Sequence, residues 1–372
     1  MAKYKIAWLP GDGIGNEVME AARMVLDHLG LDAEYIHGDI GWEFWKAEGD
    51  PLPARTVEML KTTDCALFGA ITSKPKEEAA AELAPELKDK GLVYRSPIVR
   101  LRQEFNLHTN LRPCKAFEGN PLNFRDGIDL VVFRENTEGL YAGVEFHPVP
   151  DEVRATLEKN NPNMKKFAAT AGEDLAISCR VFTRAGCRSI ATQAFEYAAK
   201  FGYKTVTVVE KPNVIRETSG LMVRTAREVA KDYPSIELWE TNIDAMCMWL
   251  IKNPQDYGVL VATNMFGDIV SDLCAQLVGG LGFACSGNIG DDYAVFEPTH
   301  GSAPKYAGQY KVNPMAMLLT SKMMLDHLGE TAMADKLQSA VAAVLKEGAA
   351  KTYDMGGTAG TLDVAKAVVE RI

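Results

Sequence analysis

The chain carries three short strand-like runs, TVTVVE at 205–210, IELWE at 236–240 and GVLVAT at 258–263. Stretches with the apolar spacing of helices surround them, at about 184–201, 218–231 and 243–252, and a further one begins at Gly267. Such alternation is typical of an α/β fold with helices on both faces of a sheet. We therefore expect this part of the chain to form strands of one sheet.

The same pattern extends towards both termini. The expected strands are 4–9, 65–70 and 128–133, and the expected helices are 17–29, 54–61, 314–328 and 331–347. Residues 74–90, rich in Ala, Glu and Lys, predict a solvated helical insertion or a mobile loop. Residues 141–182 are less periodic and contain three prolines, which predicts an excursion from the main body. The length of 372 residues favours two domains or one large one.

Composition excludes several classes of function. The formal net charge is −10, with both signs mixed along the chain, whereas nucleic-acid and membrane-surface binders more often present a basic face. Seven cysteines form no Cys-x-x-Cys pair, so we expect free thiols in a reducing cytoplasm. Six histidines show no zinc-site spacing, and no stretch reads as a signal peptide or membrane span.

Three arginines form the first chemical constellation. Arg102 and Arg112 lie ten residues apart, in LR (101–102) and NLRP (110–113), and Arg134 directly follows the strand DLVVF (129–133). Arginine binds a carboxylate through two parallel hydrogen bonds, so a small acid with several carboxylates needs such groups. Taken singly, each arginine is better explained as a surface ion-pair partner.

An acidic constellation follows the last of the three runs. Asp268 and Asp272 are four residues apart, so their carboxylates share one helical face near its first turn. Asp244 from another helix would complete three hard oxygen ligands for Mg²⁺ or Mn²⁺. Aspartates at a helix start also complement the helix dipole, and that explanation fits a lone aspartate better than this pair of like charges.

Two further side chains have proton chemistry. Lys211 ends the strand 205–210, at the edge where α/β sheets place ligands, and a desolvated, cationic surrounding would let its amine act as a base. Tyr141, in RENTEGLY (134–141), is a candidate proton donor. The plainer readings are a solvated strand-end lysine and a half-buried tyrosine.

Two glycine-containing segments could approach phosphate. FEPTHGSAPKYAG (296–308) combines small residues, turn formers, a histidine and Lys305, so its backbone N–H groups and Lys305 could contact a nucleotide. The N-terminal GDGIG (11–15) lacks the spacing of a Rossmann fingerprint, because its third glycine comes two residues after the second.

Seven motifs in order carry a resemblance across nearly the whole chain. The sequence resembles the β-decarboxylating dehydrogenases, the family of isocitrate, homoisocitrate and 3-isopropylmalate dehydrogenases. The motifs are LPGDGIG (9–15), LR-x9-RP (101–113), RENTEGLY (134–141), KPN (211–213), Asp244, N-x2-GD-x3-D (264–272) and EP-x-HGSAP (297–304). Together they are far more specific than any one of them.

The resemblance implies a two-domain α/β fold with a non-Rossmann nucleotide site. The large domain would comprise residues 1–108 and 262–372 with the cofactor loop, and the small domain would comprise 109–261 with the dimer interface. The excursion at about 141–182 would be an intersubunit arm. The active unit would be a homodimer in which Lys211 and Asp244 reach into the partner's site.

The resemblance also implies residue roles. Ser96, Arg102, Arg112 and Arg134 would bind substrate carboxylates, and Asp244, Asp268 and Asp272 would hold Mg²⁺ or Mn²⁺ as a Lewis acid. Lys211 would assist removal of the hydroxyl proton during hydride transfer, and Tyr141 would protonate the product of CO₂ loss. The cofactor residues would be His300, Gly301, Ser302, Ala303, Lys305, Tyr306, Asn313 and Tyr353.

The sequence departs from the family pattern at two places. Pro212 follows Lys211 where a small residue is usual, which stiffens the turn but keeps the amine. In the substrate-selecting stretch YRSPIV (94–99), Ser96 matches isocitrate enzymes, whereas Ile98 replaces their asparagine and SPIV is closer to some homoisocitrate enzymes. The specific hydroxy acid therefore stays open.

The cofactor residues favour NADP over NAD. Lys305-Tyr306, Lys311 and Tyr353 resemble NADP-using isocitrate enzymes, and NAD users have an acidic residue at position 305. Gly356-Gly357 stands where an arginine would support the 2′-phosphate. The leading expectation is isocitrate oxidation to 2-oxoglutarate with NADP. The alternatives are homoisocitrate or 3-isopropylmalate dehydrogenase, or a non-catalytic regulatory subunit of the same family.

Overall fold

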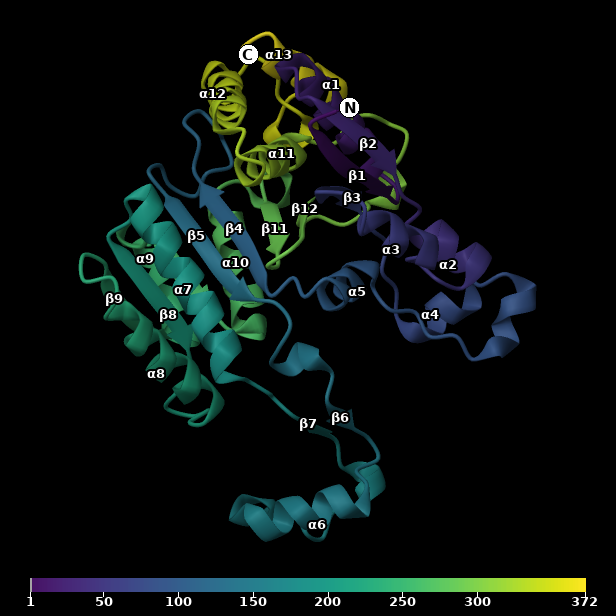
Figure 1. Ribbon diagram of the computed structural model, residues 1–372, viewed down its shortest axis with the longest axis vertical. Coiled ribbons are helices and arrows are strands. Elements are labelled where there is room, and N and C mark those ends of the chain that lie inside the picture. The colour runs from purple at the N-terminus through teal and green to yellow at the C-terminus, as the bar shows by residue number, and fades with distance from the viewer. Residues whose placement is uncertain (1) are drawn as a thin grey trace.

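The computed structural model describes residues 2–372, and its centre is one ten-stranded mixed sheet (Figure 1). The strand order is β2-β1-β3-β12-β11-β4-β5-β10-β8-β9. The strands are β1 (Tyr4–Gly11), β2 (Ala33–His37), β3 (Cys65–Ala70), β4 (Thr109–Lys115), β5 (Asp129–Glu135), β8 (Thr205–Glu210), β9 (Glu237–Asn242), β10 (Val259–Ala262), β11 (Cys285–Ile289) and β12 (Ala294–Pro298).

Two parallel halves meet at antiparallel strands in the middle of this sheet. β2, β1, β3 and β12 pair in parallel, and so do β5, β10, β8 and β9. Between them β11 pairs antiparallel with both β12 and β4, and β4 pairs antiparallel with β5. The alternating pattern of 184–278 correctly predicted β8, β9 and β10, whereas β4, β11 and β12 were not expected.

Helices cover both faces of the sheet, as the sequence predicted (Figure 1). Along β10, Val259 and Val261 pack towards α7 and α8, while Leu260 and Ala262 pack towards α9 and α10. The helices are α1 (Gly15–Leu29), α2 (Trp42–Glu48), α3 (Ala54–Leu60), α4 (Lys76–Ala81), α5 (Pro97–Glu104), α6 (Asp151–Asn160), α7 (Arg184–Phe201), α8 (Thr218–Ala230), α9 (Ile243–Lys252), α10 (Asn264–Leu277), α11 (Met315–His327), α12 (Thr331–Glu347) and α13 (Thr361–Val369). The division into two domains at residues 108 and 262 stays a prediction.

The Ala- and Glu-rich stretch 74–90 packs more than we expected. It forms α4 and a 3₁₀ turn (Pro85–Lys90), and its apolar side chains Ala79, Leu83 and Leu87 are buried against Trp42 and Trp45. The indole N–H of Trp45 donates to the carbonyl of Ala79 at 2.8 Å. The predicted helical insertion is present and most of its residues are exposed or partly exposed, but its apolar side covers a small separate core.

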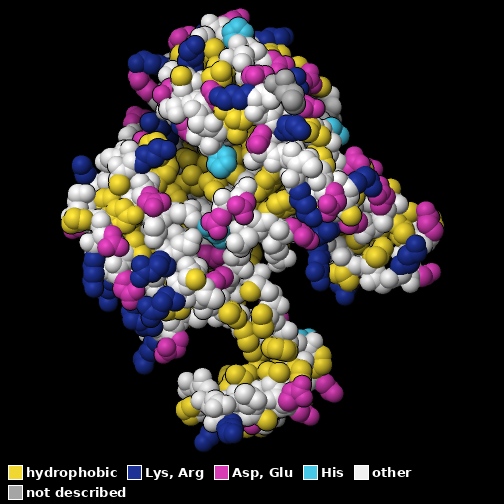
Figure 2. Space-filling view, in the orientation of Figure 1, with side chains coloured by type: hydrophobic (Ala, Val, Ile, Leu, Met, Phe, Trp, Pro, Cys, Tyr) yellow, Lys and Arg dark blue, Asp and Glu magenta, His cyan; other side chains and the backbone are white. Residues whose placement is uncertain are grey.

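The stretch expected to leave the main body forms a projecting arm (Figure 1). Two short antiparallel strands, β6 (Glu145–Phe146) and β7 (Ile177–Ser178), lead to α6, which buries none of its residues within this chain. Figure 2 shows hydrophobic side chains along the arm. Val144 and Phe167, which belong to this segment, are exposed. An arm with exposed apolar side chains suits contact with another protein surface.

All seven cysteines are free thiols in the structure. Among residues 2–372, no helix is long and apolar enough to cross a membrane.

Candidate active site

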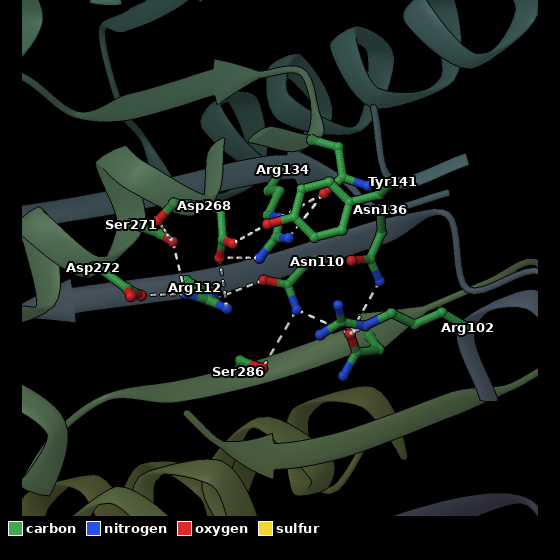
Figure 3. A network of polar contacts seen from close by, with 12 residues as sticks. Arg102, Asn110, Arg112, Arg134, Asn136, Tyr141, Asp268, Ser271, Asp272 and Ser286 are labelled. Atoms are coloured by element: carbon green, nitrogen blue, oxygen red, sulfur yellow. Dashed lines mark hydrogen bonds and ion pairs between the residues drawn. The ribbon is translucent and has the colours of Figure 1, made fainter. Parts of the chain in front are cut away.

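Three buried arginine side chains lie together beside the central strands (Figure 3). Arg102 extends from α5, Arg112 from β4 and Arg134 from the carboxyl end of β5. Each is at most 8% exposed. Burial lowers the pKa of Arg102 and of Arg134, since desolvation disfavours the charged guanidinium. Acidic partners or an anionic ligand offset the cost of burying three like charges together.

Asp268 and Asp272 of α10 supply acidic partners. Arg112 donates through Nη1 to Asp272 Oδ1 at 2.7 Å, and its Nη2 lies 3.7 Å from Asp268 Oδ1. Arg134 donates to the same oxygen of Asp268. Both carboxylates therefore face the arginines from one side of the helix, as their spacing predicted. The helix begins at Asn264 rather than Gly267, so Asp268 lies beyond the first turn.

The start of α10 also fixes Arg134. Asn264 Oδ1 accepts from Arg134 Nε at 3.0 Å and from Nη2 at 2.8 Å. A Cβ atom at Gly267 would lie 2.6 Å from Arg134 Cγ, so glycine is required for this close approach. These contacts leave Arg134 one geometry, with its Nη1 directed at Asp268.

Tyr141 completes the cluster from the base of the arm. Its hydroxyl donates to Asp268 Oδ2 at 2.5 Å, and the Arg134 guanidinium lies 5.2 Å from the centre of its ring. Burial and the hydrogen bond to Asp268 raise the pKa of Tyr141. The side chain is 39% exposed, so a protonated phenol reaches the site and remains open to a ligand.

A cavity of about 220 Å³ lies next to the arginines. Ser96, Arg102 and Arg112 line it together with residues 297–301. Ser96 directly precedes α5 but makes no capping hydrogen bond, so its hydroxyl is available to a ligand. A larger groove of about 740 Å³, lined by residues such as Tyr197 and Met323, contains none of the predicted site residues. The smaller cavity thus joins predicted substrate residues with the predicted cofactor loop.

Lys211 and Asp244 form a separate pair. Lys211 Nζ donates to Asp244 Oδ1 at 2.5 Å, and this contact lowers the pKa of Asp244. Within residues 2–372 the immediate partner of Lys211 is therefore a carboxylate, and not the cationic group considered from the sequence. Among residues 2–372, no three His, Cys, Asp or Glu side chains form a group that could hold a metal ion. A single chain therefore does not bring Asp244 together with Asp268 and Asp272.

The glycine-rich N-terminal turn supports the cofactor loop. Ile14 N donates to Ser302 O at 2.9 Å, and a Cβ atom at Gly13 would lie only 2.2 Å from that carbonyl. Ser302 Oγ lies within hydrogen-bond distance, 2.6 Å, of Thr72 Oγ1. Ala303 adopts a left-handed conformation (φ 37°) that directs the chain into the turn carrying Lys305. The predicted residues His300, Gly301, Ser302 and Ala303 thus form one loop, in which Ser302 is buried and Gly301 is exposed.

A basic and aromatic cluster follows this loop. Lys305 and Lys311 lie 4.7 and 4.3 Å from the centre of the Tyr306 ring, and Tyr353 lies 5.7 Å from Tyr306 between ring centres. The hydrogen bond from Lys305 lowers the pKa of Tyr306. Asn313 is buried, and its side chain donates to Asp354 Oδ2 at 3.1 Å. Two ammonium groups beside two aromatic rings suit a phosphate-bearing nucleotide.

Sequence reasoning missed several supporting residues. Glu17 of α1 is buried and accepts backbone hydrogen bonds from Gly308 and Tyr310, which holds the cofactor loop. A buried glutamate inside an otherwise apolar helix face was the available signal. Asn136 and Asn288 also join the arginine network (Figure 3 labels Asn136). Asn136 lies inside the motif RENTEGLY (134–141) but was given no role, and Asn288 lies outside the quoted motifs.

Comparison with known proteins gives a consistent result. Residues 5–370 match the family described as isocitrate/isopropylmalate dehydrogenase. A 3-isopropylmalate dehydrogenase of Archaeoglobus fulgidus is 43% identical over 98% of each chain. An isocitrate/homoisocitrate dehydrogenase of Thermus thermophilus is 40% identical over 99% of this chain and 98% of its own.

Protein DlpA of Legionella pneumophila is 42% identical over 98% of this chain, which spans only 58% of that relative's length. A crystal structure of isocitrate dehydrogenase from Methylococcus capsulatus superposes with a TM-score of 0.84, at 38% identity and 99% coverage of both chains.

Proposed function

Since this chain belongs to the isocitrate/isopropylmalate dehydrogenase family, whose members are decarboxylating dehydrogenases, we propose that it oxidises and decarboxylates isocitrate to 2-oxoglutarate with NADP. The observation that carries the proposal is the cluster of buried arginines beside one cavity: Arg112 and Arg134 face Asp268, to which Tyr141 also donates, and Arg102 lines the cavity with Arg112. Relatives with three different substrate names stand near 40% identity, so the acid itself must be tested.

The arginines bind the substrate through its carboxylates. Buried guanidinium groups hold carboxylates strongly because little water competes for the hydrogen bonds. Ser96, which directly precedes α5, offers a hydroxyl to the same cavity. Three fixed cations and one hydroxyl favour a tricarboxylic over a monocarboxylic acid.

Two side chains handle protons. Lys211 accepts the proton of the substrate hydroxyl, directly or through solvent, as hydride passes to the nicotinamide. Tyr141, whose raised pKa keeps the phenol protonated, donates a proton to the carbon from which CO₂ has left. Asp268 orients Tyr141 through their 2.5 Å hydrogen bond.

The acidic residues suit a divalent cation by their chemistry. Asp268 and Asp272 present carboxylate oxygens, the ligands that Mg²⁺ and Mn²⁺ prefer, and Asp244 would contribute a third from a second copy of the chain. When bound, the ion supplies Lewis-acid polarisation of the substrate oxygens.

A homodimer with shared sites accounts for the separation of Lys211 and Asp244 from the arginine cluster. The helices that flank these residues expose large apolar side chains: Met248 and Ile251 on α9 and Ile269 on α10 are each at least 46% exposed. Exposed apolar groups of this size favour association with a partner surface. In this arrangement each site takes Tyr141 and Asp268 from one chain and Lys211 and Asp244 from the other.

A substrate panel tests the proposed reaction. Isocitrate, homoisocitrate, 3-isopropylmalate, malate and tartrate are each combined with NAD or NADP and with Mg²⁺ or Mn²⁺, and reduced nicotinamide is followed by absorbance. We expect the highest kcat/KM for isocitrate with NADP. A higher value for homoisocitrate or 3-isopropylmalate would reassign the substrate within the family. Turnover with none of the pairs would contradict the dehydrogenase assignment.

The cofactor preference depends on Lys305. Lys305→Asp should raise the KM for NADP about 10- to 100-fold, since a charge-assisted hydrogen bond to the 2′-phosphate is lost and a repulsion replaces it. The KM for NAD should change far less. The matched control is Lys336→Asp on the exposed side of α12. Equal losses with the two cofactors would remove Lys305 from phosphate recognition.

A further inference from the structure

One buried side-chain amide lies between two of the site arginines. Asn288 of β11 is fully buried, and its Oδ1 accepts three hydrogen bonds. The donors are Arg102 Nε at 2.9 Å, Asn110 Nδ2 at 3.0 Å and Asn136 Nδ2 at 3.0 Å. Strands β4 and β11, helix α5 and the residue that follows β5 therefore meet at a single oxygen atom.

The orientation of this amide is fully determined. Arg102 can only donate, so the atom facing it must be the carbonyl oxygen of Asn288. On the other side Asn288 Nδ2 donates to Glu297 Oε1 at 2.8 Å, and a carboxylate can only accept. A flipped amide would break both contacts, so this side chain has one arrangement.

The same chain of contacts continues to the second arginine. Asn110 donates to Asn288 and accepts from Arg112 Nε at 2.7 Å. A chain of three hydrogen bonds therefore connects Arg112 Nε with Arg102 Nε, through the side-chain amides of Asn110 and Asn288. Within residues 2–372, Arg102 donates through Nε and, at 3.4 Å, through Nη2, which leaves its Nη1 for the cavity.

We propose that Asn288 is a positioning residue that sets the orientation of Arg102 relative to Arg112, and thereby the spacing at which two substrate carboxylates are bound. The inference rests on the proposed function in one respect, namely that both arginines bind the acid. Asn288 itself need not touch substrate or cofactor. Its role follows from accepting from Arg102 Nε directly and from being linked to Arg112 Nε through Asn110.

Removing the amide should weaken binding of the acid selectively. In Asn288→Leu the volume is kept, but Arg102 Nε and the two asparagine donors lose their common acceptor. We expect the KM for the preferred hydroxy acid to rise about 10- to 100-fold, as for other residues that orient binding groups. The KM for NADP should stay within about twofold of the wild-type value, because Asn288 has no contact with the cofactor loop beyond Glu297.

A second, nearly isosteric variant tests the hydrogen-bond pattern itself. In Asn288→Asp two carboxylates face each other, so one proton is held between them more readily than at a lone carboxyl group. A protonated Asp at 288 can donate to Glu297 and accept from Arg102, as the asparagine does. The ratio of variant to wild-type KM for the acid should therefore fall by about threefold or more from pH 8 to pH 6.

Asn120→Leu is the matched control, since Asn120 is a buried asparagine that bonds the backbone of Val278 and Leu122 instead of an arginine. It should lower the melting temperature without the selective change in KM. If folded Asn288→Leu keeps the wild-type KM for the acid, or raises the KM values for acid and NADP equally, and Asn288→Asp shows no pH-dependent recovery, the positioning role is wrong. Absence of turnover in the wild-type enzyme would instead reject the proposed function.

Discussion

Replacing Asp268 by asparagine is expected to lower kcat/KM about 1,000-fold, equivalent to about 4 kcal/mol of transition-state stabilisation. Asp268 accepts hydrogen bonds from Arg134 and Tyr141 and lies 3.7 Å from Arg112. It therefore contacts both the arginines proposed to bind substrate and the tyrosine proposed to donate a proton. Asparagine keeps the volume and one acceptor oxygen but loses the charge. Steady-state kinetics against Mg²⁺ and Mn²⁺ concentration measure the effect.

A matched control is Asp335→Asn, an exposed aspartate of α12. It should leave kcat/KM and the metal concentration for half-maximal rate within about twofold of wild type, as expected for a surface substitution. Circular dichroism and the melting temperature would separate lost chemistry from lost folding. Unchanged metal dependence in folded Asp268→Asn would remove this carboxylate from the metal site.

The parts of the fold that the sequence predicted are those built from local periodicity. Val259 to Ala262 read as a strand because all four side chains are apolar, and the structure buries them on both faces. The apolar face of α1, including Val18 and Leu26, was visible at helical spacing and is fully buried. These assignments need no knowledge of which strand neighbours which.

The central strands were missed because function overrides the usual pattern there. β4 and β11 place Asn110, Arg112 and Asn288 inside the protein, where a strand normally has apolar side chains. Their pairing joins segments more than 170 residues apart, so no local signal announces it. Pro113 in β4 also argued against a central strand.

The candidate site likewise contains residues that the sequence identified and residues that it did not. Arg134 and Asp268 could be named because each stands near the end of a recognisable element, within a long motif. Asn288, which orients Arg102, lies outside the quoted motifs, and asparagine at a strand position usually indicates a turn. The contact between Lys211 and Asp244 of α9 was not predictable from local sequence, because the two residues are 33 positions apart.

Mixing two inactive variants is expected to restore activity if each site takes residues from two chains. Lys211→Ala and Tyr141→Phe should each lose at least about 100-fold in kcat, since each removes a proton-transfer group. Random assembly of the two makes half of the dimers mixed, and each mixed dimer holds one intact site and one doubly altered site. Co-expression with two different affinity tags should therefore give about a quarter of the wild-type specific activity before purification of the mixed dimer, and about half after it.

The choice of partners makes this experiment decisive. Lys211→Ala mixed with Asp244→Asn should stay inactive, because both residues serve the site of the partner and no mixed dimer then contains an intact site. A site confined to one chain predicts no recovery for either mixture. Recovery in the second mixture as well would show that the two residues of the Lys211–Asp244 pair, 2.5 Å apart in one chain, act in different sites. Only recovery in the first mixture alone agrees with a site that takes Tyr141 from one subunit and both Lys211 and Asp244 from the other.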